Sequence, residues 1–168
     1  MKTNFYYYFF ILPKSQYVYD VRFTPHLVQI YPSYSLFHYN KNHDVLHYNT
    51  KHRRDIKKKM YKDHLVDNHH IIPKEFNNHP LLRELQVDTS CSKNIFFLPN
   101  RYAKEWVGHE EWIFHTSHPK YNKYVLKELN SIHQLNDKEN RYYQFSLFFM
   151  YLYQSLEHNE PNIKKLFS

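Results

Sequence analysis

Short apolar segments that end at prolines dominate the middle of the chain. Residues 64–73, HLVDNHHIIP, predict a short strand that Pro73 stops, and residues 94–99, NIFFLP, predict a second strand that also closes on a proline. Proline cannot donate a hydrogen bond to a strand ladder, which keeps both strands short. The region from 63 to 130 is therefore expected to fold from brief elements.

Two helices are predicted in this region. The leucines of residues 79–88, HPLLRELQVD, recur at helical spacing and predict a short helix. Residues 116–135, TSHPKYNKYVLKELNSIHQL, predict the clearest helix of the chain. The residues that support it are Thr116 or Ser117 as a cap, Pro119 in the first turn, and an inward stripe of Tyr121, Val125 and Leu129.

The flanking segments predict strands before this region and helices after it. The apolar segment 1–16 is too short for a membrane span and has no small-residue cleavage site, so we expect a buried strand. Residues 17–23 and 27–31 predict further strands, and residues 100–107 predict a helical turn or two before Gly108. Residues 141–158 are apolar, but charges flank them and polar side chains interrupt them, which predicts a packed helix.

Composition limits both the architecture and the ligands that a metal could use. A chain of 168 residues with 42% hydrophobic residues can bury one core, and its mixture of strands and helices predicts a single α+β domain. Cys91 is the only cysteine, which excludes an internal disulfide and a cysteine-based zinc site. Any metal would therefore be held by His, Asp, Glu or Asn.

The charge of the chain favours a polyanionic partner. The net charge is +7, which suits binding to the phosphates of nucleic acid. Residues 51–62, KHRRDIKKKMYK, form a basic run. Two interpretations of this run stay open: a solvated helix face, or a helix or arm that faces phosphates.

Histidines occur in the first of the two predicted strands and again just before the helix that follows the second strand. His69 and His70 end the first strand, Asn94 begins the second, and His115 and His118 precede the helix. A divalent cation bound by His69 and one or both late histidines would polarise a phosphate. His70 would then be free to take the proton of an attacking water, since an imidazole pKa near 6.5 suits base catalysis at neutral pH. The Asn94 amide would hold the intervening loop and leave a backbone carbonyl aimed at His70.

Four blocks in this order resemble the AHH family of the HNH/endonuclease VII superfamily. The blocks are DNHHIIP, HPLL, NIFFLP and SHPKYNKYV, and they fall within about residues 66–130. The resemblance implies a ββα-metal (His-Me finger) nuclease core at 63–135. The resemblance says nothing about the flanking residues, for which we expect an N-terminal extension at 1–62 that adds strands and ends in the basic segment, and a C-terminal helical extension at 136–168.

The resemblance also implies roles for individual residues. His69 and His118 become metal ligands, His70 the general base, and Asn94 the central asparagine of the H-N-H pattern. Strict alignment puts Phe114 where the family has a further histidine, and a one-residue deletion would bring His115 there instead. The other departures are Asn68 in place of alanine, Ile95 in place of a common glycine, and Thr116 at a second glycine position.

The expected function is a metal-dependent endonuclease that acts on DNA or RNA. Zn²⁺ and Mg²⁺ are the first candidates for the cation, followed by Mn²⁺ and Ni²⁺. AHH domains are often predicted as the toxin tips of bacterial polymorphic toxin systems, which implies an immunity protein as partner; a defence role is the related alternative. The expected location is the cytoplasm, or a target cell after delivery, with no membrane association. A non-catalytic nucleic-acid-binding module with a structural metal site is the competing hypothesis.

Overall fold

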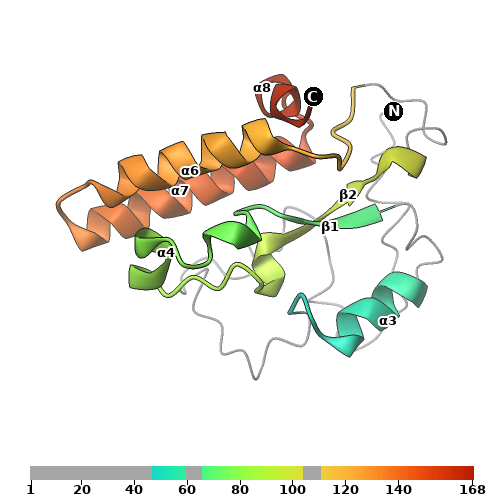
Figure 1. The fold of residues 1–168 in the computed structure, drawn as a ribbon, viewed down its shortest axis with the longest axis horizontal. Helices are drawn as coiled ribbons and strands as arrows, with labels where there is room; N and C mark the ends of the chain where they lie inside the picture. Colours follow the sequence, from blue (N-terminus) through green and yellow to red (C-terminus); the bar gives the residue numbers. More distant parts are fainter. Residues whose placement is uncertain (1–46, 60–65, 104–110) are drawn as a thin grey trace.

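One small antiparallel sheet and a set of helices make up the fold. The computed structural model describes residues 47–59, 66–103 and 111–168. In chain order, the elements are α3 (Lys51–Lys59), β1 (Val66–His70), η2 (Lys74–Phe76), α4 (Pro80–Glu84), η3 (Ser92–Asn94), β2 (Ile95–Pro99), α6 (Pro119–His133), α7 (Lys138–Glu157), α8 (Pro161–Lys164) and η4 (Lys165–Phe167) (Figure 1). This combination is an α+β fold.

Both strands predicted in the middle of the chain are present. They pair antiparallel, with Val66 opposite Pro99 and His70 opposite Ile95. The expectation that Pro73 stops the first strand is wrong, because β1 already ends at His70. Beyond that point Asn94 replaces the strand partner: its carbonyl accepts from the Ile71 N–H, and its side chain accepts from the Ile72 N–H.

The helix that follows the strands begins later than its sequence suggests. We expected Thr116 or Ser117 to cap it, and that is wrong: His118 is the N-cap residue and Pro119 opens α6. The Thr116 hydroxyl donates instead to the Phe167 carbonyl at 2.9 Å. The expected inward stripe is confirmed, since Tyr121, Val125 and Leu129 are fully buried.

The short helix expected at 79–88 is confined to α4. The His79 ring caps it by accepting from the Leu81 N–H at 3.2 Å. Gln86 adopts a φ of 56°, in the left-handed region. A helix cannot continue through that conformation, which explains why the helical turn stops early.

The core lies between the sheet and the helices. Figure 1 shows α6 and α7 running side by side, with α4 next to them. One buried cluster joins Ile71 and Ile72 to Phe96 and Leu98 of β2 and to apolar side chains of α4, α6, α7 and α8. The packed helix predicted at 141–158 is α7, which starts at Lys138. In the described ranges, the helices lack the length and apolar content that crossing a bilayer requires.

Arg53 of α3 contacts the opposite face of β2. Ile95 and Phe97 are buried there, and the Arg53 guanidinium lies 5.3 Å from the centroid of the Phe97 ring. Arg53 is itself buried and donates to the Asn68 side chain at 3.3 Å. The basic run thus contains one buried arginine, while its other described cations are exposed: Lys51, Arg54 and Lys58.

Some sequence predictions fall outside the described residues. These are the strands expected at 1–16, 17–23 and 27–31, and residues 104–107 of the helical segment expected at 100–107. Residues 101–103 are helical, in agreement with the start of that segment.

A buried carboxyl at the end of α7 should make stability depend on pH. Glu157 is 8% exposed, and burial raises its pKa from 4.5 to about 7, with the His158 imidazole 3.8 Å away. The folded state therefore binds this proton more tightly than the unfolded chain does. The stabilisation is complete below pH 4.5 and is lost as the pH rises through 7, by roughly 2–3 kcal/mol.

Urea unfolding at pH 5 and pH 8 measures this effect. Glu157→Gln should reduce the difference in unfolding free energy between the two pH values by that amount. Glu139→Gln, an exposed matched control on the same helix, should leave it unchanged. An equal pH dependence in wild type and Glu157→Gln would contradict the assignment.

Candidate metal centre

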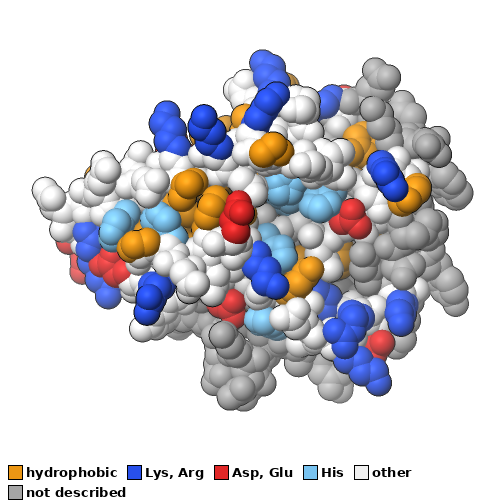
Figure 2. All heavy atoms as spheres, viewed as in Figure 1, with side chains coloured by type: hydrophobic (Ala, Val, Ile, Leu, Met, Phe, Trp, Pro, Cys, Tyr) orange, Lys and Arg blue, Asp and Glu red, His pale blue; other side chains and the backbone are white. Residues whose placement is uncertain are grey.

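Three imidazoles from separate segments meet beside the sheet. His69 comes from β1, His115 from the loop before α6, and His118 from the N-cap of α6. Their ring centroids are 5.0–5.5 Å apart, and one nitrogen from each lies within 4.8 Å of the others. Figure 2 shows histidine side chains gathered on the viewed face near the beginning of α6. Three nitrogens at this spacing can converge on one cation.

Backbone pairing decides which residue of the loop joins this group. The His115 N–H donates to the Pro99 carbonyl at 2.7 Å, and His115 forms a bridge with Asn100. These contacts hold His115 against the end of β2. The neighbouring Phe114 is buried in a separate apolar cluster with Ala103 and Trp112. Of the two alignments left open by the sequence, the structure brings His115, not Phe114, to His69 and His118.

His69 is an unusual buried polar side chain. It is 1% exposed, and neither of its ring nitrogens has a hydrogen-bond partner among the residues that the structure describes. Burial, and then the neighbouring His118 and His115, hold its pKa well below 6.5, so the ring is neutral. Buried polar atoms are nearly always paired, and an unpaired one needs a physical reason. A metal ion bound by one nitrogen would supply that reason, so the residues present fit a cation.

The partners of His118 indicate which of its nitrogens is free. The Asn122 Nδ2 donates to the Glu75 carboxylate at 2.6 Å, which turns the amide oxygen towards His118 Nδ1 at 2.9 Å. A carbonyl oxygen only accepts, so Nδ1 carries the proton and Nε2 keeps its lone pair. Burial lowers the pKa of His118, which favours the neutral ligand form.

A carboxylate orients His115 in the same way. Its Nδ1 lies 3.2 Å from the Asp67 Oδ2 atom, which can only accept. Nδ1 is therefore the protonated nitrogen and Nε2 is the available one. Hydrogen bonds of this kind fix the tautomer and ring orientation of histidines that bind metals.

His70 lies next to this group in a different environment. Its Nε2 is buried and has no hydrogen-bond partner in the described part of the chain, and its ring packs on Tyr48 with centroids 4.6 Å apart. Burial, followed by the charges of Lys74 and Arg53, lowers its pKa to about 4. The ring is therefore neutral at neutral pH, so one of its nitrogens keeps a lone pair.

Asn94 organises the turn that carries His70. Its side chain accepts from the Ile72 N–H and donates to the Ile72 carbonyl, both at 2.8 Å, and donates to the Thr89 carbonyl at 2.6 Å. This agrees with the expected loop-holding amide. The backbone carbonyl expected to face His70 is not found among the described residues. The carbonyl of Asn94 itself bonds to the Ile71 N–H.

Three residues at the site were not identified from the sequence. Tyr48 reaches His70 because its N–H donates to the Ser90 carbonyl, which anchors the segment before α3. Glu75 contributes through Asn122, and Phe167 packs on the rings of His69 and His118. Nothing local marks these residues, since each acts across a large sequence separation.

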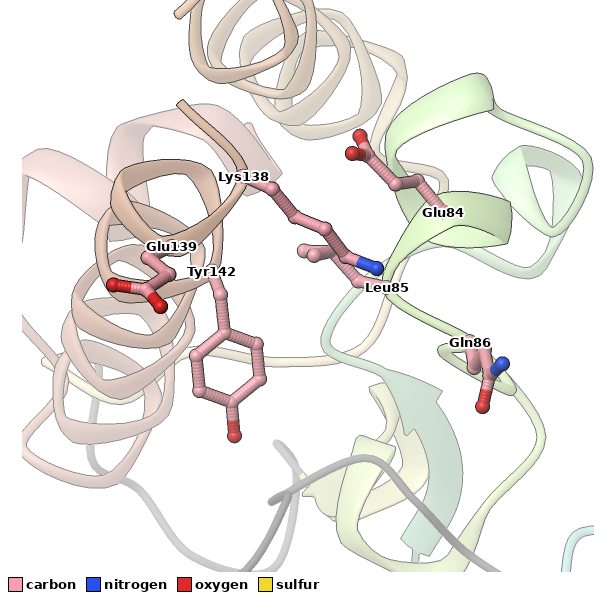
Figure 3. Close-up of a pocket in the computed structure, with 6 residues that line it drawn as sticks. All are labelled: Glu84, Leu85, Gln86, Lys138, Glu139 and Tyr142. Atoms are coloured by element: carbon pink, nitrogen blue, oxygen red, sulfur yellow. The ribbon is translucent and has the colours of Figure 1, made fainter. Parts of the chain in front are cut away.

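A pocket elsewhere on the molecule is separate from this site. It has a volume of about 420 Å³ and lies between the end of α4 and the beginning of α7 (Figure 3). Its lining residues are Glu84, Leu85, Gln86, Lys138, Glu139 and Tyr142, none of which belongs to the histidine group.

Comparison with known proteins agrees with the chemistry of this site. A family model described as a nuclease family of the HNH/ENDO VII superfamily with conserved AHH matches residues 50–146, which is more than half of the chain. The protein is therefore a nuclease of the HNH/ENDO VII superfamily. Within that superfamily, the chain belongs to the AHH family. No curated protein and no solved structure gave a significant match.

The chain departs from the family signature at Asn68, which stands where the signature has alanine. The structure provides a use for the larger side chain. The Asn68 amide oxygen accepts from the buried Arg53 guanidinium at 3.3 Å, and so links β1 to α3.

Proposed function

We propose that this protein is a metal-dependent endonuclease that hydrolyses phosphodiester bonds in nucleic acid, with β1, β2 and α6 as a ββα-metal core. The observation that carries the proposal is the convergence of three imidazoles, one with two unpaired buried nitrogens, beside a fourth neutral imidazole. Residues 63–135 then form the nuclease core, and the segments on either side are extensions of it.

His69, His115 and His118 would hold the cation. When bound, a divalent cation acts as a Lewis acid that polarises the phosphate and stabilises the leaving oxygen. The hydrogen bonds to Asp67 and Asn122 would keep the Nε2 lone pairs of His115 and His118 available. Imidazole ligands suit Zn²⁺ or Ni²⁺ better than Mg²⁺ or Mn²⁺, which favour oxygen ligands. We therefore favour Zn²⁺ over Mg²⁺.

His70 would act as the general base. In the reaction, water forms a bond to phosphorus, the bond from phosphorus to the leaving oxygen breaks, and the His70 imidazole takes the proton of the water. Tyr48 packs against the ring and orients it. Asn94 positions His70 indirectly, because it fixes the backbone at Ile71 and Ile72 immediately after it.

Cations around the site would bind the phosphate backbone. Figure 2 shows Lys and Arg side chains gathered over α3. Lys51, Arg54 and Lys58 are exposed on this helix, while Arg53 anchors it to β1 and β2. Phosphate contacts of this kind make binding fall steeply with salt concentration. This arrangement favours the phosphate-facing interpretation of the basic run.

The competing hypothesis, a structural metal in a non-catalytic module, fits less well. Structural zinc sites usually close with four protein ligands, whereas catalytic sites keep one position open. Within the described ranges, the group that could hold a metal offers three ligands. His70, the proposed proton acceptor beside these three ligands, would also have no role in a structural site.

Cleavage assays with and without metal test the proposed function. Purified protein stripped of metal is incubated with supercoiled plasmid and with single-stranded RNA, each with Zn²⁺, Mn²⁺ or Mg²⁺, or with chelator. Cleavage of at least one substrate is expected with metal and should cease with chelator. Cleavage that persists undiminished in excess chelator would sink the metal mechanism. Salt-sensitive binding without any cleavage would favour the non-catalytic module.

A further inference from the structure

We propose that Phe167 is a positioning residue of the metal centre, as the apolar wall behind the histidine ligands. This inference rests on the proposed function and deepens it. Phe167 lies in η4, beyond the residues 50–146 that match the family. A segment outside the family match would then complete the metal centre of this protein.

The ring contacts of Phe167 point to this role. Its ring centroid lies 5.3 Å from that of His69 and 5.2 Å from that of His118. It also lies 5.0 Å from the ring of Tyr121, whose hydroxyl donates to the Ile71 carbonyl at 2.6 Å. Phe167 is 7% exposed. His69 and His118 are therefore packed against two aromatic rings, one of which is tied to the backbone just after β1.

Hydrogen bonds tie the same segment to the loop that carries the other ligands. Thr116 lies between His115 and His118 in the sequence, and its hydroxyl donates to the Phe167 carbonyl at 2.9 Å. Earlier in the loop, the Ile113 N–H donates to the Asn159 side chain at 2.7 Å. The loop is thus held at two points by residues that follow α7.

An apolar wall has two physical consequences for the ligands. It shields the nitrogens of His69 from water, which leaves the one with the lone pair available to a cation. It also restricts the ring orientations of His69 and His118, so less entropy is lost when a cation binds. Both effects raise metal affinity without a direct contact between Phe167 and the metal.

Metal affinity is the measurement that tests this role. Protein stripped of metal is titrated with Co²⁺, followed by visible absorption, and its Tm is recorded separately without metal. Phe167→Ala should raise the Kd for Co²⁺ by about 10-fold or more, as expected for a residue that supports metal ligands. Phe167→Leu, which keeps an apolar side chain, should recover most of the affinity.

Leu166→Ala is the matched control. Leu166 directly precedes Phe167, is partly buried and packs on the core, but carries no aromatic ring. It should lower the Tm with little change in the Kd. If Phe167→Ala fails to fold, Thr116→Val serves in its place: it removes only the hydroxyl that binds the Phe167 carbonyl, and it should also weaken Co²⁺ binding.

The outcomes separate this inference from the proposed function. A wild-type protein that binds no Co²⁺ would overturn the proposed function itself. Wild-type binding with an unchanged Kd in Phe167→Ala would overturn the positioning role alone. Equal weakening by Leu166→Ala and Phe167→Ala would also overturn it, because the effect would then follow the stability of the segment.

Discussion

Replacing His70 with alanine is expected to slow phosphodiester cleavage by about 10²–10⁴-fold, which is the usual contribution of a general base. The Kd for the metal should stay close to the wild-type value, because His70 does not belong to the group of three imidazoles. The loss should appear in kcat, since His70 acts on the attacking water. Plasmid or RNA cleavage under saturating metal measures the rate, and Co²⁺ titration measures the affinity.

Two further variants make this experiment specific. His69→Ala should lower both metal affinity and cleavage, because it removes a proposed ligand. His133→Ala removes an exposed histidine at the end of α6 and should change neither quantity. A His70→Ala protein that cleaves at the wild-type rate would rule out the base assignment and leave the metal site untouched.

Replacing Asn94 with alanine is expected to cause the largest loss of stability. The substitution would leave the Ile72 N–H, the Ile72 carbonyl and the Thr89 carbonyl without their present partner, all at a residue that is 1% exposed. Each unpaired buried group costs about 1–3 kcal/mol, so the free energy of unfolding should fall by about 3 kcal/mol or more. That is a large part of the stability of a single domain.

Urea unfolding monitored by circular dichroism measures this loss. Asn130→Ala is the matched control, since Asn130 is exposed on α6 and its side chain bonds to the side chain of His79. Its unfolding free energy should stay within about 0.5 kcal/mol of wild type, as for most surface substitutions. An Asn94→Ala protein as stable as the control would contradict the bonding role of this amide.

Predictions based on local periodicity were confirmed. The stripe of Tyr121, Val125 and Leu129 is buried in α6. Such patterns succeed because the 3.6-residue period is a property of the helix itself. The two strands were located for a similar reason: short apolar runs bounded by turn residues and prolines suit short paired strands.

Predictions of element ends failed where a distant partner intervenes. β1 stops at His70 because Asn94, more than twenty positions later, binds the backbone of Ile72. Thr116 does not cap α6 because its hydroxyl bonds to the Phe167 carbonyl. In both cases a long-range hydrogen bond replaced the local one that the sequence suggested.

The sequence by itself determined the chemistry available to this protein. With one cysteine, a metal site could not be built on thiolates, and the ordered blocks of His69-His70, Asn94 and His118 pointed to imidazole ligands and to the AHH family. These conclusions depend on residue types and their order, which the sequence states directly.

Only the tertiary structure decided which side chains meet. It placed His115 beside His69 and turned Phe114 into a separate cluster, because the backbone of His115 pairs with Pro99 at the end of β2. It also brought Tyr48 to His70 and Phe167 to His69, although neither lies within the residues that match the family. The reason is physical: ring packing and backbone pairing between distant segments depend on the folded path of the chain, and residue order alone does not specify that path.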